Sequence, residues 1–258
     1  MTFQETAVET ELLELSDLGP RVVAIGGGHG LAQVLEAAQG YAGTLTAIVT
    51  VADDGGSSGR LTSSLDIPPP GDIRKCLLAL SPRPSVPREL FAYRFEESDV
   101  AGHSLGNLML AALTELLEGD FEAAIRIASS LLGTVGRVVP VARQSLHLQA
   151  VVEGRLVDGQ AAITKTRGAI SELRLVPEDE KANPEALEAI ASADQILVGP
   201  GSLFTSVLPA LVVPGMSEAL NHAPGRIVCI LNLVTQDGET LGMSCVDHIA
   251  ALRRIGGL

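Results

Sequence analysis

Three glycine-rich segments, each directly after a run of apolar residues, constrain the fold of this chain of 258 residues most strongly. The runs 22–25, 45–51 and 195–198 are predicted strands, and they lead into the segments GGGHG, DDGGSSG and GPGS. The first strand, its glycine loop, a helix beginning near Leu31 and the second strand span about 30 residues, as a βαβ unit does. Such units build doubly wound, mainly parallel sheets, so the sequence predicts a Rossmann-like α/β fold.

The rest of the chain is predicted to form further helices, one more inner strand and a small insertion. Residues 1–19 are expected to be a mobile acidic extension, which leaves a single domain over 20–258. Asp72 is the expected N-cap of a helix over 73–80. Alternating segments between about 138 and 176 predict a small antiparallel β insertion. Apolar spacing elsewhere predicts an inner strand at 226–231 and helices at 105–117, 120–132, 184–192 and 244–254.

Charge and composition exclude several classes of partner. The formal net charge of −13, from 18 basic and 31 acidic side chains, repels nucleic acid and anionic membrane surfaces. Two Tyr, five Phe and no Trp are too few for a base-stacking platform. The chain has no apolar run long enough for membrane insertion, and we expect no signal peptide. Three widely separated cysteines, Cys76, Cys229 and Cys245, predict reduced thiols, a cytoplasmic location and no cysteine metal site.

The glycine segments predict a site for a nucleotide or another phosphorylated ligand. In open α/β sheets ligands bind beyond the carboxyl ends of strands, where free backbone N–H groups point at anions. Any one segment alone could be only a tight turn, but three at one sheet edge favour a shared site. The dinucleotide fingerprint needs glycine where Leu31 stands, and a P-loop needs lysine after Gly30. Ordinary NAD dehydrogenases and P-loop NTPases are therefore not favoured, and backbone N–H groups are expected to hold the phosphates.

Four charged side chains extend this candidate site, and each has a second interpretation. Asp53 and Asp54 follow the second strand, where a carboxylate can bond sugar hydroxyls or help to hold a divalent metal. One of them could instead cap the loop by accepting from the N–H groups of Gly55 or Gly56. Arg60 and Arg74 are candidate forks for phosphate or carboxylate groups, or members of surface ion pairs.

The segment Gly102–Gly106 also matches G-x-S-x-G, the nucleophile elbow of serine hydrolases. That motif requires a strand before the serine, whereas residues 95–101 are charged and do not resemble a buried strand. Ser104 and Asn107 are expected instead at the N-terminal end of a helix near the same sheet edge, with His103 structural or facing the ligand. Chain order alone does not exclude a hydrolase, because candidate partners follow: Asp194, His222 and His248.

Several blocks of sequence, taken in order, resemble one known family. They are GGGHGL, TAIVTVADDGGSSGRL, PPPGDIRKCLLAL, GHSLGNL, GPGSLFTSVLPALVVPG and the following LN-x-x-TQDGET. Together they are similar to YvcK-type gluconeogenesis factors, relatives of the CofD 2-phospho-L-lactate transferases, over roughly residues 21–254. The resemblance implies a Rossmann-like cytosolic protein that binds UDP-sugars, notably UDP-N-acetylglucosamine, and acts in cell-wall synthesis and cell shape without catalysing a reaction. We expect a homo-oligomer, a dimer.

The expected site combines the glycine segments with the positions that match the family. Its nucleotide contacts are expected from Gly27, Gly28, His29, Gly30, Ser57, Asn107, Gly199, Gly201 and Ser202. Sugar or acceptor contacts are expected from Asp53, Asp54 and Arg74. His29 stands where many members have threonine, which removes one hydroxyl contact, and members usually continue beyond the position of Leu258.

The transferase is the alternative function that the resemblance implies. It would move a phospholactyl group from a guanylyl donor onto a deazaflavin precursor, with Mg²⁺ as its cofactor. A tricyclic acceptor needs aromatic or apolar walls, and the chain offers few aromatic residues. The regulator is therefore the preferred interpretation. No cofactor is assigned to it, and no metal site is expected.

Overall fold

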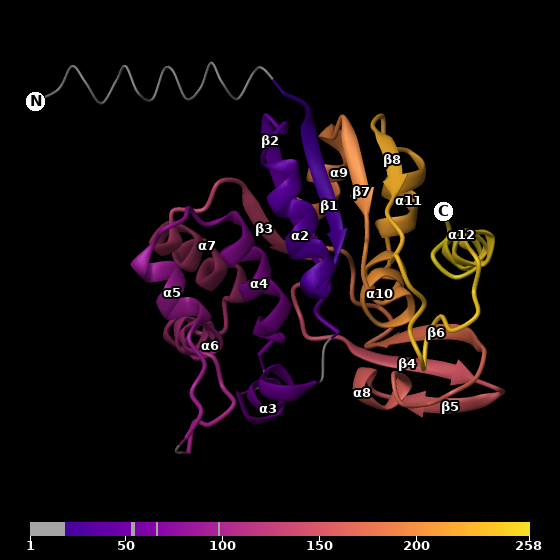
Figure 1. Cartoon of the computed structure of the whole chain (residues 1–258), viewed down its shortest axis with the longest axis horizontal. Coiled ribbons are helices and arrows are strands. Elements are labelled where there is room, and N and C mark those ends of the chain that lie inside the picture. The colour runs from indigo at the N-terminus through magenta and orange to yellow at the C-terminus, as the bar shows by residue number, and fades with distance from the viewer. Residues whose placement is uncertain (1–18, 53–54, 66, 98) are drawn as a thin grey trace, which may run out of the picture.

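A five-stranded parallel sheet forms the centre of the protein, as the computed structural model shows for residues 19–52, 55–65, 67–97 and 99–258 (Figure 1). The strand order is β3-β2-β1-β7-β8, and every neighbouring pair is parallel. The strands are β1 (Arg21–Gly26), β2 (Thr44–Val49), β3 (Arg137–Pro140), β7 (Gln195–Val198) and β8 (Arg226–Cys229). This arrangement confirms the predicted Rossmann-like α/β class.

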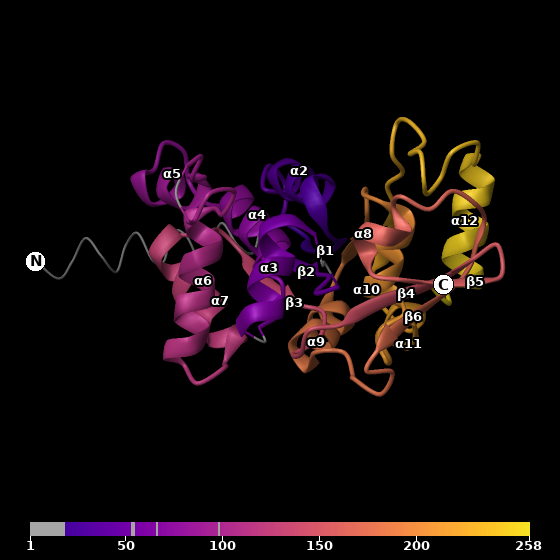
Figure 2. The same ribbon diagram turned by 90° about the horizontal axis from the view of Figure 1, so that it is seen from below.

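Helices cover both faces of the sheet because consecutive strand residues point to opposite sides. Val22 and Ala24 pack in one core with α2 (Gly28–Ala38) and α4 (Pro70–Leu80). Val23 and Ile25 pack in the other core with α9 (Pro184–Ser192) and α10 (Leu208–Leu211). The two helical layers are visible on either side of the strands in Figure 2. Both faces are therefore buried, as the apolar strand sequences predicted.

The remaining helices lie at the two ends of the sheet. On the side of β3 lie α5 (Val86–Ala92), α6 (Leu105–Leu116) and α7 (Phe121–Leu132), and α3 (Gly56–Leu65) lies below α4, as Figure 1 shows. After β7 come the π-helix η1 (Leu203–Val207), α10 and α11 (Met216–Asn221), and α12 (Cys245–Arg254) ends the chain. The predicted helices 105–117, 120–132, 184–192 and 244–254 are confirmed to within one residue at each boundary.

The antiparallel insertion is smaller than predicted. It consists of β4 (His147–Val152), β5 (Arg155–Asp158), α8 (Gln160–Ile163) and β6 (Ile170–Val176), with strand order β5-β4-β6. In Figure 1 it lies below the carboxyl ends of β7 and β8. The predicted start near 138 is wrong, because Arg137–Pro140 pairs in parallel with β2 in the main sheet. A short apolar run does not show which sheet it joins.

Two further predictions are corrected by the structure. The strand predicted as inner at 226–231 is β8, which ends at Cys229 and lies at the edge of the sheet. Apolar side chains on both faces of β8 indicate contact with both cores, but they do not report how many strands flank it. Asp72 is not the N-cap of α4, because the helix begins at Pro70, with Pro69 as its N-cap. Proline is favoured in this first turn, where no N–H is needed.

The predicted acidic extension lies almost wholly outside the described residues, which begin at Gly19. Its mobility therefore stays a prediction. Within the part of the chain that the structure describes, no helix is long and apolar enough to cross a membrane.

Candidate functional site

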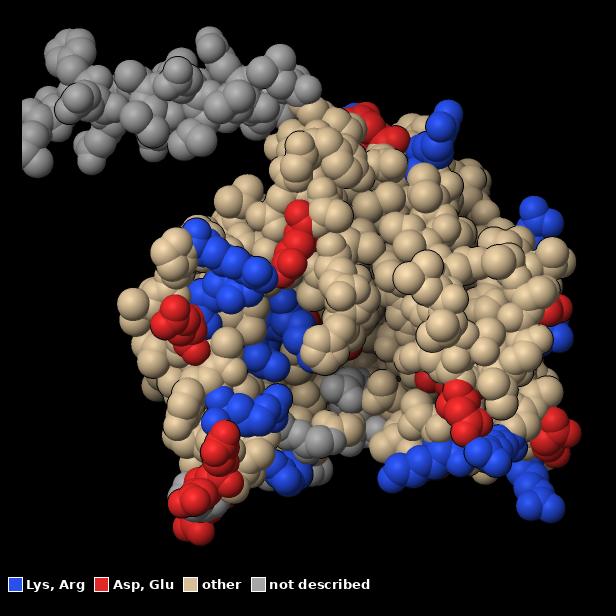
Figure 3. Space-filling model, in the orientation of Figure 1, with Lys and Arg blue, Asp and Glu red and all other residues tan. Residues whose placement is uncertain are grey.

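Two of the three glycine segments converge on one cavity at the carboxyl edge of the sheet. Because β1 and β7 are parallel neighbours, the chains that leave them emerge side by side. Gly27–Gly30 and Pro200–Ser202 line a cavity of about 730 Å³ together with residues 230–234, which follow β8. The other lining residues are Gln33, Asp72, Lys75, Gln160, Ser206 and Gln236. Figure 3 shows this face of the molecule hollowed near its centre. We call this space the glycine-loop cavity.

Gly30 is the point at which the two glycine segments touch. A Cβ atom on Gly30 would lie 2.5 Å from the carbonyl oxygen of Pro200 and 3.3 Å from the backbone nitrogen of Gly201. Real Cβ atoms do not approach backbone atoms so closely, so this position requires glycine. The first and third segments therefore form one continuous wall of backbone.

The N-terminus of α2 forms part of this wall. The first N–H groups of a helix have no intrahelical acceptor, and the helix dipole favours an anion there. One of them, the Gly28 N–H, donates to Oδ2 of Asp72 at 2.6 Å. The N–H groups of His29 and Gly30 also belong to the first turn. Because the Gly28 N–H is already bonded to Asp72, the N–H groups of His29 and Gly30 are the donors of this turn that remain for a negatively charged ligand.

Side chains from distant parts of the chain complete the glycine-loop cavity, and sequence reasoning missed most of them. Lys75 reaches it from α4, and its Nζ donates to Oδ1 of Asp72 at 2.8 Å. Asn232 donates to the carbonyl oxygen of Gly201 at 2.9 Å and contacts Gln236. Asn232 and Gln236 belong to the LN-x-x-TQ block, which was the signal available in the sequence. No comparable signal marked Gln160, which comes from the insertion.

Two of the other predicted residues, Arg74 and Asn107, do not line the glycine-loop cavity. Arg74 is buried, and its Nε donates to Oδ1 of Asn107 at 2.9 Å. Burial lowers the pKa of Arg74, and the charge of Arg94 lowers it further. Gly199 is the residue directly before the lining segment Pro200–Ser202 and does not itself line the cavity. The remaining predicted positions, Asp53, Asp54 and the side chain of Ser57, lie outside the described residues.

A second basic group lies beside Arg74 and includes His103. Arg60 donates through Nε to Nε2 of His103 at 3.2 Å. Burial lowers the pKa of His103, and the charges of Arg60 and Arg94 act in the same direction. In Figure 3, Lys and Arg side chains gather over α4 to α6, on one side of the hollow. Cations are thus concentrated near the candidate site of a chain that is acidic as a whole.

Mg²⁺, which the transferase would use, needs oxygen ligands such as carboxylates and phosphates. Among the described residues that line the glycine-loop cavity, Asp72 is the single carboxylate, and both of its oxygens already accept hydrogen bonds. The described residues also contain no group of three His, Cys, Asp or Glu side chains that could hold a metal. The described lining residues alone therefore do not offer the set of free carboxylates that Mg²⁺ needs, and the candidate metal ligands Asp53 and Asp54 lie outside the described residues.

A separate cavity of about 600 Å³ lies between the insertion, η1 and α12. Its least exposed charged residue is Glu239, which accepts from the N–H of Phe204 at 3.0 Å and from the hydroxyl of Thr205. Burial raises the pKa of Glu239, against the effect of these hydrogen bonds. None of the predicted site residues lines this cavity, so it is not the nucleotide site that the sequence indicates.

Ser104 has a structural role in the described protein. Its side chain is 0% exposed, and its Oγ accepts from the N–H of Asn107 as the N-cap of α6. The residues before it form only an isolated bridge between Arg94 and Ser104 in place of the strand that a nucleophile elbow requires. Asp194 stands just before β7, at the opposite edge of the sheet, paired with Arg21. The geometry of a serine hydrolase is therefore not formed around Ser104.

We expect Ser104→Ala to lower the free energy of unfolding by about 1 kcal/mol, the usual cost of losing a serine N-cap. Hydrolysis of ester substrates should stay at background in both proteins. Labelling by a fluorophosphonate, followed by mass spectrometry, checks this. Specific labelling of Ser104 in the folded wild type would contradict the structural role.

Comparison with known proteins identifies relatives over almost the whole chain. The family model described as 2-phospho-L-lactate transferase CofD matches residues 22–257. The gluconeogenesis factor of Halalkalibacterium halodurans is 48% identical, over 90% of this chain and 72% of the relative. The gluconeogenesis factor of Bacillus subtilis is 46% identical, over 91% of this chain and 74% of the relative. A crystal structure of a Bacillus halodurans protein superposes with a TM-score of 0.90 at 46% identity, covering 93% of this chain and 78% of that one.

Proposed function

This chain belongs to the CofD family, and from that premise we propose that it is a regulatory protein that binds a nucleotide sugar of the UDP class. The expected ligand is UDP-N-acetylglucosamine. The observation that carries the proposal is the glycine-loop cavity, where the N-terminus of α2 and the segment Pro200–Ser202 present backbone to one space. Such backbone cradles suit a diphosphate.

The lining of the cavity supports a nucleotide sugar more than a deazaflavin acceptor. Amide side chains surround it, from Gln33, Gln160, Asn232 and Gln236. Amides offer both donors and acceptors, which match the hydroxyl and carbonyl groups of a sugar or a pyrimidine base. The described lining residues include no Phe, Tyr or Trp to stack on a tricyclic ring, and its apolar contacts would come mainly from residues 230–234. The transferase named by the family model therefore ranks second.

The relatives named gluconeogenesis factor support a role that depends on the carbon source. We place this protein in the control of cell-wall synthesis and cell shape during growth on gluconeogenic substrates. A nucleotide sugar that is a cell-wall precursor would report the supply of building blocks to such a regulator. Deletion of the gene should alter cell shape on gluconeogenic carbon sources and leave it normal on glucose.

Calorimetry of the purified protein tests which ligand it prefers. The affinities to be compared are those for UDP-N-acetylglucosamine, UDP-glucose, GDP and NAD. We expect UDP-N-acetylglucosamine to bind most tightly, with no turnover on prolonged incubation. Tighter binding of GDP, together with phospholactyl transfer to a deazaflavin precursor, would establish the transferase instead. Failure of every nucleotide to bind the folded protein would remove the glycine-loop cavity as a nucleotide site.

A further inference from the structure

Asp72 already occupies the position at the N-terminus of α2 that favours an anion. Asp72 is 6% exposed and lies on the first turn of α4, forty-four positions after Gly28 in the sequence. Oδ2 accepts from the Gly28 N–H at 2.6 Å, and Oδ1 accepts from Nζ of Lys75 at 2.8 Å. Since Gly27 contributes no side-chain cap, α2 receives its capping anion from another helix.

The charges that line the glycine-loop cavity balance each other. Among its described lining residues, Lys75 is the single Lys or Arg and Asp72 the single Asp or Glu. They form an ion pair in which Asp72 is nearly inaccessible to solvent. Moving Asp72 away would break both of its hydrogen bonds and leave a buried charge without a partner, which is costly. An entering ligand thus meets a negative charge that is fixed in place.

We propose that Asp72 is a specificity-determining residue that selects diphosphate diesters, as in nucleotide sugars, over nucleoside diphosphates with a free terminal phosphate. The inference rests on the proposed function and deepens it. A sugar on the terminal phosphate removes one ionisable oxygen, so the diester carries less negative charge than the free diphosphate. Backbone N–H donors serve both ligands, but the fixed carboxylate of Asp72 repels the additional charge. Repulsion is strongest where burial excludes water.

Lys75, the ion-pair partner of Asp72, favours the binding of anionic ligands, whereas Asp72 opposes it. While it neutralises Asp72, the cavity tolerates the diester. Without Lys75, the carboxylate of Asp72 would keep the hydrogen bond from the Gly28 N–H and the attraction of Arg74 but lose its ion-pair partner, so every anionic ligand would bind less well. The loss should be larger for the ligand with more charge. Asp72 and Lys75 therefore shift the preference between the two ligands in opposite directions when each is replaced.

The deciding experiment measures the affinities for UDP-N-acetylglucosamine and UDP by calorimetry in the wild type and in Asp72→Asn. Asparagine keeps an oxygen that can accept from the Gly28 N–H and removes the charge. We expect the wild type to prefer UDP-N-acetylglucosamine, and Asp72→Asn to reduce that preference about tenfold by binding UDP more tightly. Asp194→Asn is the matched control, because it removes a salt-bridged carboxylate at the opposite sheet edge. Its preference should equal that of the wild type.

Lys75→Gln supplies an independent test if Asp72→Asn does not fold. It should weaken both ligands and increase the preference for UDP-N-acetylglucosamine. An unchanged ratio of affinities in a folded Asp72→Asn, even with weaker binding of both ligands, would show that Asp72 only positions the loop and would overturn the proposal. An unchanged ratio in Lys75→Gln would do the same. If the folded wild type binds neither ligand, the proposed function fails, and this inference fails with it.

Discussion

Replacement of Gly30 by alanine is expected to weaken ligand binding at the glycine-loop cavity by at least about a hundredfold, or about 2.8 kcal/mol. The new Cβ would lie 2.5 Å from the oxygen and 2.9 Å from the carbonyl carbon of Pro200. Both are backbone atoms that cannot rotate away, so the two segments must separate. The N–H groups on either side would then no longer reach one diphosphate. Calorimetry with UDP-N-acetylglucosamine measures the effect, and circular dichroism confirms that the variant is folded.

Alanine variants at two other glycines distinguish the steric clash at Gly30 from the strain of a left-handed backbone conformation. At Gly28 a Cβ would meet nothing within 4 Å, but φ is +70°, a left-handed conformation that costs an L-residue roughly 1–2 kcal/mol. Gly28→Ala should therefore weaken binding by about tenfold. Gly40→Ala, outside the cavity and with its nearest contact at 3.5 Å, should bind as the wild type does. Wild-type affinity in a folded Gly30→Ala would mean that the ligand binds elsewhere.

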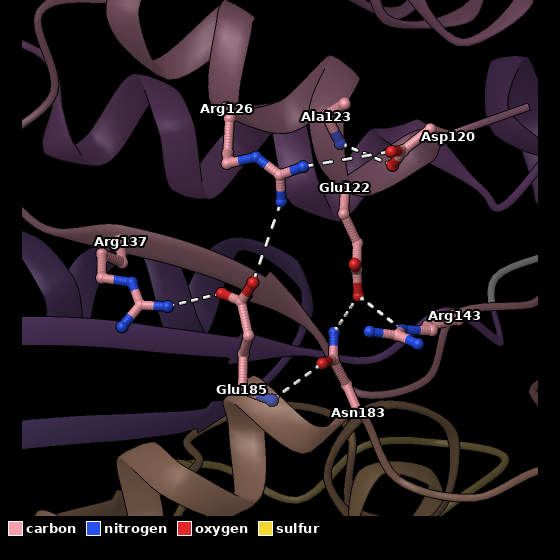
Figure 4. A network of polar contacts seen from close by, with 8 residues as sticks. All are labelled: Asp120, Glu122, Ala123, Arg126, Arg137, Arg143, Asn183 and Glu185. Carbon is pink, nitrogen blue, oxygen red and sulfur yellow. Dashed lines mark hydrogen bonds and ion pairs between the residues drawn. The ribbon is translucent and has the colours of Figure 1, made fainter. Parts of the chain in front are cut away.

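Asn183→Ala is expected to lower the free energy of unfolding by about 3 kcal/mol. Asn183 is 1% exposed; its Oδ1 accepts from the N–H of Glu185 at 2.9 Å as the N-cap of α9. Its Nδ2 donates to Oε1 of Glu122 in α7 at 2.6 Å, as Figure 4 shows. A lost cap costs about 1 kcal/mol, and a lost hydrogen bond to a charged group about 1.5–3 kcal/mol. Denaturant unfolding measures the change.

The ion pairs around Asn183 provide the control for this prediction. Arg126 contacts Asp120 at 4.0 Å and Glu185 at 3.8 Å, with its side chain 59% exposed (Figure 4). Exposed pairs of this kind contribute about 0–1 kcal/mol. Arg126→Ala should therefore change stability by less than about 1 kcal/mol. If both variants lose the same stability, the buried link between α7 and α9 is not the stabilising part of the network.

Local sequence patterns predicted three strands of the main sheet and the shared cavity of two glycine segments. Apolar runs predicted β1, β2 and β7, and glycines after them predicted where the chain leaves the sheet. Helical spacing of apolar residues predicted the bounds of α6, α7, α9 and α12. These signals act over a few residues, so they are present in the sequence itself. They brought Gly27–Gly30 and Pro200–Ser202 into one predicted site, and the structure places both segments on one cavity.

The contents of that site depend on contacts that no local pattern encodes. The residue directly after Gly30 is not the lysine of a P-loop, yet Lys75 reaches the glycine-loop cavity from α4. Asp72 was interpreted as a cap for its own helix, and in the structure it accepts from the first N–H of α2. Arg74 and Asn107, predicted beside the ligand, bond each other instead. Each of these pairs joins elements far apart in the chain.

The amino-acid sequence by itself determined the fold class, the family and the sheet edge at which a ligand is expected, because buried strands and glycine turns are short-range features. Only the tertiary structure decided that β8 is an edge strand and that β3 belongs to the main sheet. It also decided that a fixed carboxylate stands at the N-terminus of α2. Strand neighbours and ion pairs between helices depend on how whole elements pack. Packing is a property of the three-dimensional arrangement and leaves no period in the sequence.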